Sequence, residues 1–174
     1  MPPTLSTQRL TLRELTPADA PFILELLNDP DFIRFIADRG VRSVEDAVRY
    51  IENGPRAMYA RHGIGLMLVE LTEGGHPVGI CGLLRRDGLD DPDLGFAFLP
   101  EHRGKGYAAE AAAATLAHGR DELGLGRILA ITSLDNHASG RVLEKLGFRF
   151  DRIVTMPGDP EELRLYANGD GQGG

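Results

Sequence analysis

The chain has 174 residues, of which 42% are hydrophobic and 26% are charged, and this length and apolar content suit one compact domain. Its 19 Lys and Arg residues against 26 Asp and Glu residues give a formal net charge of -7, which repels nucleic-acid phosphates and anionic lipids at long range. We therefore expect no nucleic-acid partner and no membrane partner, although a local basic patch can still hold one small anion.

Cysteine and histidine usage limits the chemistry of the chain. Cys81 is the only cysteine, so no intramolecular disulfide and no Cys-rich metal site can form. The five histidines show neither HxxxH nor HExxH spacing, and we expect no metal. The N-terminal segment lacks a basic stretch followed by an apolar one, and no stretch approaches the roughly 20 apolar residues that cross a bilayer. These features predict a cytoplasmic protein.

Local patterns in the first part of the chain predict one strand and three helices. Leucines alternate with polar residues in the segment QRLTLRE, which is typical of a half-buried strand. Thr16 and Asp19 flank Pro17 in the pattern of a capping box at the start of a helix. Ser43 and Asp46 repeat the same spacing. We therefore expect a strand at 8–14 and helices at 16–28, 31–37 and from 43.

The period of the apolar residues changes beyond Gly63. IGLMLVEL and PVGICGLL are apolar runs separated by TEGGH, a glycine-containing hairpin turn, and DLGFAFL is a third run that ends at Pro100. These runs predict antiparallel strands. An alanine-rich segment then predicts a long helix, and a second capped helix should end at Gly147. We expect strands at 64–71, 77–84, 93–99, 127–134, 148–154 and 163–167, and helices at 107–123 and 136–146.

The predicted fold class is a mixed α/β sheet with helices on both faces. Helices come first, a meander of strands follows, and a β-α-β-α-β segment ends the chain. No internal repeat or linker is visible, so we expect a single domain over residues 1–168. The segment 169–174 is short, polar and rich in glycine, and we expect it to be disordered.

A glycine turn before the long helix is the most informative feature. The first N–H groups of a helix have no partners within it, and with the positive end of the helix dipole they form an anion site. Gly104 and Gly106 have no Cβ, so an anion can approach the backbone closely. Arg103 and Lys105 add local positive charge. The turn suits a pyrophosphate, and a plain tight turn is the structural alternative.

Two other nucleotide-binding motifs fit this turn less well. A P-loop requires GxxxxGK followed by Ser or Thr, whereas Lys105 is followed by Gly106 and the first glycine is missing. A Rossmann fingerprint requires GxGxxG early in a βαβ unit, and Gly104, Gly106 and Ala109 match only part of it. We therefore expect neither motif.

The residues RGKGYA, from Arg103 to Ala108, resemble the R/QxxGxG/A motif of GNAT acetyltransferases, and so does the AAEAAAA that follows. The resemblance implies that the loop amides hold the pyrophosphate of acetyl-CoA, which is a cosubstrate. It also implies that the preceding strand splays from its neighbour, so that its main chain can pair with pantetheine. The residues implied for cofactor binding are Phe96, Ala97, Phe98, Arg103, Gly104, Lys105, Gly106, Tyr107 and Ala108.

A second match lies one helix and one strand downstream. The segment DNHASGRVLEKLGF, from Asp135 to Phe148, resembles the NxxSxxxxEKxGF pattern of the same superfamily. The resemblance covers nearly the whole chain and is closest to the branch that contains ribosomal-protein N-terminal acetyltransferases. It implies Asn136 and Ser139 as catalytic and cofactor-binding residues, with Asn136 on the CoA arm and Ser139 protonating the departing thiolate. The structural alternative makes Asn136 a helix N-cap and Ser139 a small first-turn residue.

No acidic residue stands out as a general base. Glu110 lies in the matched motif, but a carboxylate in a first helical turn also interacts favourably with the helix dipole. A protein α-amine, with a pKa of about 7.8, is partly neutral at pH 7, whereas a lysine amine, with a pKa of about 10.4, is almost wholly charged. The lack of an obvious base therefore favours an α-amine acceptor. We expect Cys81, in an apolar strand, to be a core residue.

These patterns together predict an acetyl-CoA dependent N-acetyltransferase that acts on a protein N-terminus or a small-molecule amine. Two alternatives stay open, namely a catalytically silent acyl-CoA-binding module and an anion-binding α/β protein unrelated to CoA. The acceptor, the acyl-chain preference and the formation of a homodimer are also left open. We expect acceptor contacts in segments 28–62 and 85–93, and the charged residues of 85–93 should be solvated surface or line the amine site.

Overall fold

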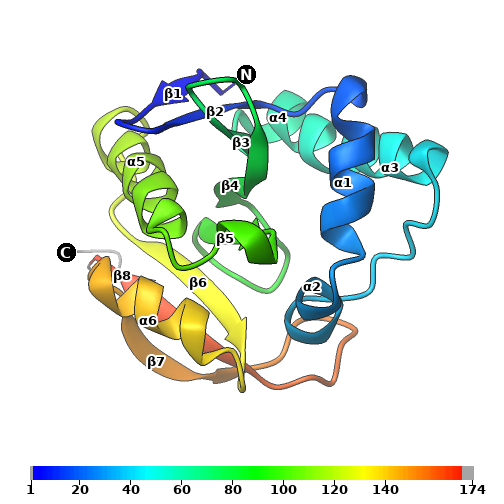
Figure 1. Ribbon diagram of the computed structural model, residues 1–174. Coiled ribbons are helices and arrows are strands. Elements are labelled where there is room, and N and C mark those ends of the chain that lie inside the picture. Colours follow the sequence, from blue (N-terminus) through cyan, green and yellow to red (C-terminus); the bar gives the residue numbers. More distant parts are fainter. Residues whose placement is uncertain (1, 170–174) are drawn as a thin grey trace.

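The computed structural model describes residues 2–169, so the expected disordered tail, apart from Gly169, lies outside the described residues. The described chain forms an eight-stranded sheet with helices on both faces (Figure 1), which confirms the predicted mixed α/β class. The strands are β1 (Leu5–Ser6), β2 (Leu10–Glu14), β3 (Leu66–Leu71), β4 (Pro77–Leu84), β5 (Asp93–Phe98), β6 (Ile128–Ser133), β7 (Arg149–Val154) and β8 (Leu163–Asn168). The helical elements are η1 (Pro17–Asp19), α1 (Ala20–Leu27), α2 (Pro30–Phe35), α3 (Val44–Ile51), η2 (Glu52–Arg56), α4 (Ala57–His62), η3 (Pro100–His102), α5 (Tyr107–Asp121) and α6 (His137–Lys145).

The strand order is β1-β2-β3-β4-β5-β6-β8-β7, and β5 with β6 is the parallel pair in this antiparallel sheet. The meander β3-β4-β5 is confirmed, and its register places Cys81 opposite Phe96. Helix α5 joins β5 to β6, because parallel neighbours cannot be joined by a tight turn. The last strand, β8, inserts between β6 and β7, an arrangement that no local pattern predicted.

Capping interactions start the first helices where the sequence predicted them. The Asp19 carboxylate accepts a hydrogen bond from Thr16 N at 2.9 Å, as the capping box requires. The Ser43 hydroxyl accepts one from Asp46 N at 3.1 Å at the start of α3. A cap of this kind typically stabilises a helix by about 1 kcal/mol.

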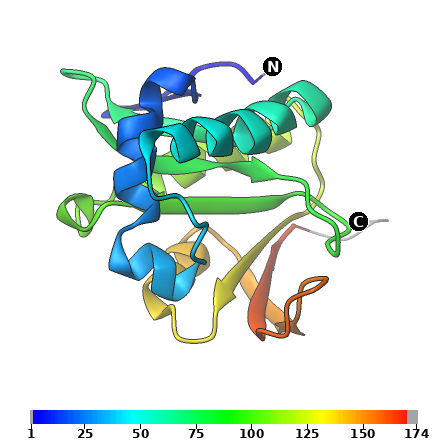
Figure 2. The ribbon, with the colours of Figure 1, turned by 90° about the vertical axis from the view of Figure 1, so that its right-hand side faces the viewer.

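The helical segment that begins at Val44 runs on farther than the sequence indicated. Figure 2 shows α3, η2 and α4 (cyan to teal) as one continuous segment. Pro55 lies inside η2, where the wider π-type turn accommodates a ring that cannot donate an N–H to an α-helix. The segment ends at Gly63, which has a left-handed φ of 71°. Among residues 2–169, no helix has both the length and the apolar composition to span a bilayer.

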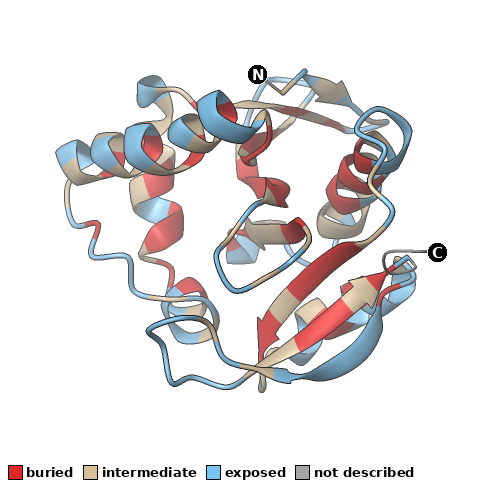
Figure 3. Cartoon of the chain, turned by 180° about the vertical axis from the view of Figure 1, so that it is seen from behind, coloured by how far each residue is buried: buried red, intermediate tan, exposed pale blue. Residues whose placement is uncertain are grey.

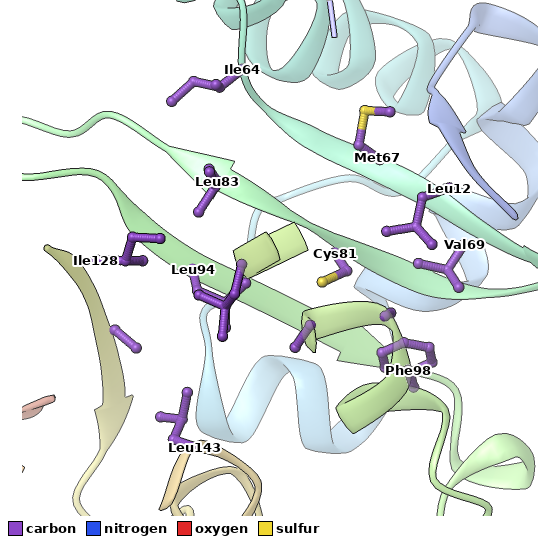
Figure 4. Close-up of a cluster of buried hydrophobic side chains, with 14 of the residues drawn as sticks. Leu12, Ile64, Met67, Val69, Cys81, Leu83, Leu94, Phe98, Ile128 and Leu143 are labelled. Carbon is purple, nitrogen blue, oxygen red and sulfur yellow. The ribbon is translucent and has the colours of Figure 1, made fainter. Parts of the chain in front are cut away.

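Buried side chains fill the space on both faces of the sheet, as the red segments of Figure 3 show. One cluster lies under α5 and α6, and Figure 4 shows Leu12, Met67, Cys81 and Phe98 in it. The other cluster lies under α1, α2 and α3. Because β5 and α5 are both anchored in the first cluster, the turn between them has a fixed position.

Candidate active site

Strands β5 and β6 pair at one position and then separate. The register places Asp93 opposite Leu129, and Leu129 N donates to Pro92 O at 2.9 Å. Within the described chain, no further pair joins the two strands. The edge of β5 that faces β6 is therefore open from this point onward, and the splayed strand pair implied by the resemblance is present.

The main chain of Phe96 and Phe98 faces this gap. Leu99 N donates to Val78 O of β4 at 3.1 Å. Hydrogen-bonding direction alternates along a strand, so the N–H and C=O groups of Phe96 and Phe98 point away from β4 and toward β6. Phe98 O accepts hydrogen bonds from the Arg103 guanidinium, so the groups left to the gap are the N–H and C=O of Phe96 and the N–H of Phe98. Their side chains lie on the α5 face. Ala97 has the opposite orientation, so its main chain faces β4 and is not offered to the gap.

The turn after β5 presents free amide donors. Gly104 and Gly106 have left-handed φ values of 75° and 84°, and Gly106 is the N-cap of α5. The first helical bond runs from Glu110 N to Gly106 O at 3.1 Å. The amide groups of 104–109 donate no hydrogen bond to any described residue. The turn thus has the donors and the dipole end that an anion site needs.

The guanidinium of Arg103, which the sequence suggested as local positive charge for the turn, is bound by two carboxylates and a main-chain oxygen. Its Nη1 donates to Asp31 at 2.6 Å and its Nη2 to Asp29 at 3.1 Å, and Nε and Nη2 both donate to Phe98 O. Its charge is therefore balanced by carboxylates at the start of α2, and this side chain ties the turn to that helix. Lys105 forms no ion pair with the described residues and is exposed, so it supplies the side-chain charge of the turn.

Arg9 holds the opposite side of the turn. Its Nη1 donates to Lys105 O at 2.9 Å, and its Nε donates to Glu110 Oε1 at 2.7 Å. Arg9 N and the Thr7 hydroxyl also donate to the Glu110 carboxylate, and the Arg9 guanidinium lies 4.6 Å from the centre of the Tyr107 ring. Glu110 is therefore a structural residue. Sequence reasoning missed Arg9, because its partner is 101 positions away.

Glu110 should make the stability of this turn depend on pH. Burial raises the pKa of Glu110, but hydrogen bonds from Thr7 and Arg9 together outweigh burial and lower the pKa below its usual value. Such a group stabilises the fold above its unfolded pKa of about 4.3, and this stability is lost as pH falls through the folded pKa. We expect Glu110→Gln to lower the free energy of unfolding at pH 7 by about 1 to 3 kcal/mol.

Urea unfolding between pH 3 and 7 measures this effect, with Glu73→Gln, in an exposed turn, as the matched control. The difference in free energy of unfolding between the native protein and Glu110→Gln should shrink toward acid pH, because the native carboxyl becomes protonated there. The control should stay close to the native protein throughout. A deficit that is constant across the range would show that ionisation of Glu110 contributes nothing.

A family model described as "Acetyltransferase (GNAT) domain" matches residues 9–149 of the chain. This span includes β2, the splayed strands, the glycine turn and α6. The chain belongs to the GNAT acetyltransferase family. Membership implies acyl-CoA-dependent acetyl transfer.

Individual relatives agree with this assignment. YoaA of Bacillus subtilis, described as an uncharacterized N-acetyltransferase, is 28% identical over 171 residues, which are 95% of this chain and 96% of YoaA. The crystal structure of an acetyltransferase from Agrobacterium tumefaciens is 29% identical and has a TM-score of 0.82 over 98% of this chain and 96% of its own. RimL, a ribosomal L7/L12 acetyltransferase solved in complex with coenzyme A, has a TM-score of 0.82 over 96% of this chain and 98% of its own at 16% identity, a likeness of fold.

Asn136 and Ser139 lie at the start of α6, beside α5. In Figure 1 both helices direct their amino-terminal ends toward the centre of the molecule. Asn136 Oδ1 accepts a hydrogen bond from Ser139 N at 3.2 Å, so its role as N-cap is confirmed, while its Nδ2 binds no described residue. Ser139 is half-buried in the first turn of α6, and its hydroxyl forms no hydrogen bond with a described residue. Their catalytic roles in this GNAT enzyme stay predictions.

Two buried hydroxyls at the end of β6 were not singled out from the sequence. Thr132 and Ser133 are 8% and 7% exposed, and their oxygens have no hydrogen-bond partner among the described residues. Ala130 packs in the α5-side cluster, so strand alternation places Thr132 on that face and Ser133 on the α1–α3 face. Buried hydroxyls without partners are costly, which makes both candidates for substrate contact. The sequence feature that could have identified these two residues is an adjacent polar pair at the end of an apolar strand.

Asp93 corrects the expectation that the charged residues of 85–93 are solvated. It is fully buried at the start of β5 and accepts hydrogen bonds from Arg86 Nε at 3.2 Å and Nη2 at 2.7 Å. Burial raises the pKa of Asp93 although the Arg86 guanidinium lowers it. Because Asp93 stands opposite Leu129, this ion pair lies at the closed end of the gap, where β5 and β6 part.

The interpretation of Cys81 as a core residue is confirmed. Its thiol is buried beside the Thr115 hydroxyl, and burial raises the pKa of Cys81 to about 12. It is therefore a thiol at neutral pH. Among residues 2–169, no group of three or more His, Cys, Asp or Glu side chains is placed to hold a metal ion.

Proposed function

We propose that this GNAT acetyltransferase transfers the acetyl group of acetyl-CoA to a primary amine, either a protein N-terminal α-amine or a small-molecule amine. The observation that supports this most directly is the run of unpaired amides at 104–109 beside the open edge of β5. A diphosphate suits donors at a helix N-terminus, and a pantetheine amide suits a free strand edge. The coenzyme A complex of the similarly folded RimL supports this choice of ligand.

The residues around the gap suit the needs of acetyl transfer, which are a polarised carbonyl, a proton for the departing thiolate and a neutral amine. The Phe96 N–H points into the gap and is the candidate donor to the thioester oxygen. The Ser139 hydroxyl is the candidate proton donor. The Ser133 hydroxyl, on the opposite face of the sheet, is the candidate contact for the amine.

The acceptor is better matched to an α-amine than to a lysine side chain. Asp93, at the closed end of the gap, and Glu110, in the first turn of α5, are both ion-paired with arginines. An α-amine, with a pKa of about 7.8, needs little help to become neutral near pH 7, whereas a lysine with a pKa of about 10.4 does. We therefore expect peptides with a free N-terminus, or small amines of similar pKa, to be the better acceptors.

Binding and turnover test this proposal separately. Calorimetry should show saturable binding of acetyl-CoA below about 1 mM, the upper end of usual KM values. Thiol release should then be followed with peptides that have free or blocked N-termini and with small amines. Since Cys81 is buried and protonated, a thiol reagent reports only the released CoA. Binding without release would favour a silent acyl-CoA-binding module, and failure to bind would refute the assignment.

A further inference from the structure

A hollow of about 320 Å³ lies between α6 and β8. His137, Arg141 and Glu144 line it from the flank of α6 opposite to Ser139, and Asn136, the N-cap of α6, lines it as well. The hollow therefore adjoins the predicted catalytic residues of α6 at Asn136, while Ser139 does not line it. The lining residues that bear on its chemistry are His137, Gly140, Arg141, Glu144, Arg164 and Tyr166.

The hydroxyl of Tyr166 is an unused donor in this hollow. Tyr166 is 5% exposed, and its hydroxyl forms no hydrogen bond with the described residues. It lies beside Gly140, where an added Cβ would approach Tyr166 Oη to 2.8 Å. The missing side chain of Gly140 thus keeps space open next to the phenol. The hydroxyl oxygen is open to the hollow, so a ligand atom that accepts a hydrogen bond can reach it.

Two arginines give the hollow a positive character in a chain with a net charge of -7. Arg164 is held in place, because its Nε donates to Leu134 O at 3.3 Å and its guanidinium lies 5.7 Å from the centre of the Phe150 ring. Neither Arg141 nor Arg164 forms an ion pair with a described carboxylate, although Glu144 lines the same hollow. Two guanidinium groups and one carboxylate leave an excess of positive charge.

An apolar surface lies next to these charges. Phe150 of β7 is 49% exposed and packs edge-on against Tyr166, with ring centres 6.1 Å apart. A large aromatic side chain that is half exposed beside a polar hollow offers a face to a flat apolar group. The volume of the hollow is that of a small-molecule site, well above the size of an inorganic ion.

We propose that this hollow is a second ligand site, which binds a small organic anion with a carboxylate or phosphate group next to a flat apolar part. The anionic oxygens are bound by Arg141, Arg164 and the Tyr166 hydroxyl, because guanidinium groups donate charge-assisted hydrogen bonds to such groups. The flat part lies against Phe150. Carboxylates and phosphate esters share this chemistry, and the two are separated by the choice of probe.

Calorimetry with phenyl phosphate and with benzoate tests the site, and benzamide is the neutral control. We expect at least one of the anions to bind saturably, and benzamide to bind at least about tenfold more weakly. Arg141→Gln and Arg164→Gln should each weaken the binding of the anion about tenfold or more, whereas Arg149→Gln, an exposed arginine of β7 outside the hollow, should not. The anion that binds with the lower Kd shows whether the site prefers a phosphate ester or a carboxylate.

Two further variants keep the test decisive. Tyr166→Phe removes only the hydroxyl and should weaken binding several-fold with the fold retained. Gly106→Val alters the glycine turn, the other anion site of the chain, and should leave binding of the probes unchanged. The proposal is overturned if neither anion binds below about 10 mM, if the hollow variants bind as the native protein does, or if Gly106→Val abolishes binding.

Discussion

Gly106→Val is expected to raise the Kd for acetyl-CoA at least about 100-fold while the protein stays folded, because several charge-assisted hydrogen bonds are lost together. Gly106 has a φ of 84°, and L residues resist this region by about 1 to 2 kcal/mol, with β-branched residues the least tolerant. An added Cβ would also lie 3.3 Å from Nη2 of Arg9, the side chain that holds Lys105 O. The turn must shift, and the amides of 104–109 shift with it.

Gly124→Val is the matched control for this prediction. Gly124 lies in the turn between α5 and β6 with a φ of 68°, and nothing lies within 4 Å of its added Cβ. The two variants should therefore lose similar free energy of unfolding from backbone strain, but Gly124→Val should bind acetyl-CoA as the native protein does. Calorimetry and urea unfolding of both variants separate the two effects. Equal affinity in Gly106→Val and the native protein would remove the turn from the binding site.

Features set by neighbours in sequence could be predicted. The caps at Thr16, Ser43 and Asn136 each act on a residue three positions away, and all of these predicted pairs are present. The positive φ of Gly104 and Gly106 also follows from local chemistry, since a strand must turn sharply into a helix there. Fold class and the placement of the glycine turn therefore needed no long-range information.

Features set by distant pairs could not be predicted. Arg9 binds Glu110 across 101 positions, and Arg103 binds Asp29 across 74. In the sequence Arg103 is only a positive charge in an anion motif and Arg9 is an arginine of the first predicted strand, so the carboxylate that neutralises each of them is invisible. Asp93 was misread for the same reason, because its burial depends on how β5 meets β6.

These pairs change the physical picture of the anion site. The sequence suggested that side-chain cations around the turn attract the diphosphate. The structure instead uses Arg9 and Arg103 to hold the turn from two sides, and each has a carboxylate partner. Attraction must then come mainly from oriented amides, the dipole of α5 and Lys105. Because these amides are already held in place, they lose little conformational freedom when the diphosphate binds. The rigidity of the turn therefore increases the affinity for the diphosphate.

Ser139→Ala is expected to lower kcat by about tenfold to a thousandfold, since general acid catalysis usually contributes about 10² to 10⁴ and a thiolate is already a fair leaving group. The cap of α6 should survive, because it uses Ser139 N and Asn136 Oδ1 and not the hydroxyl. Stability and the Kd for acetyl-CoA should therefore stay near native values.

The conservative variant Ser139→Thr decides whether the hydroxyl itself acts on the reaction. Threonine keeps an O–H at the same helical position, so it should recover part of the kcat that Ser139→Ala loses, whereas a purely steric effect would make the larger residue worse. Single-turnover measurements at saturating acetyl-CoA isolate the chemical step from product release. Native kcat in Ser139→Ala would remove this residue from the mechanism. A weakened Kd with unchanged kcat would make it a binding residue, and the proton for the thiolate would then have to come from solvent.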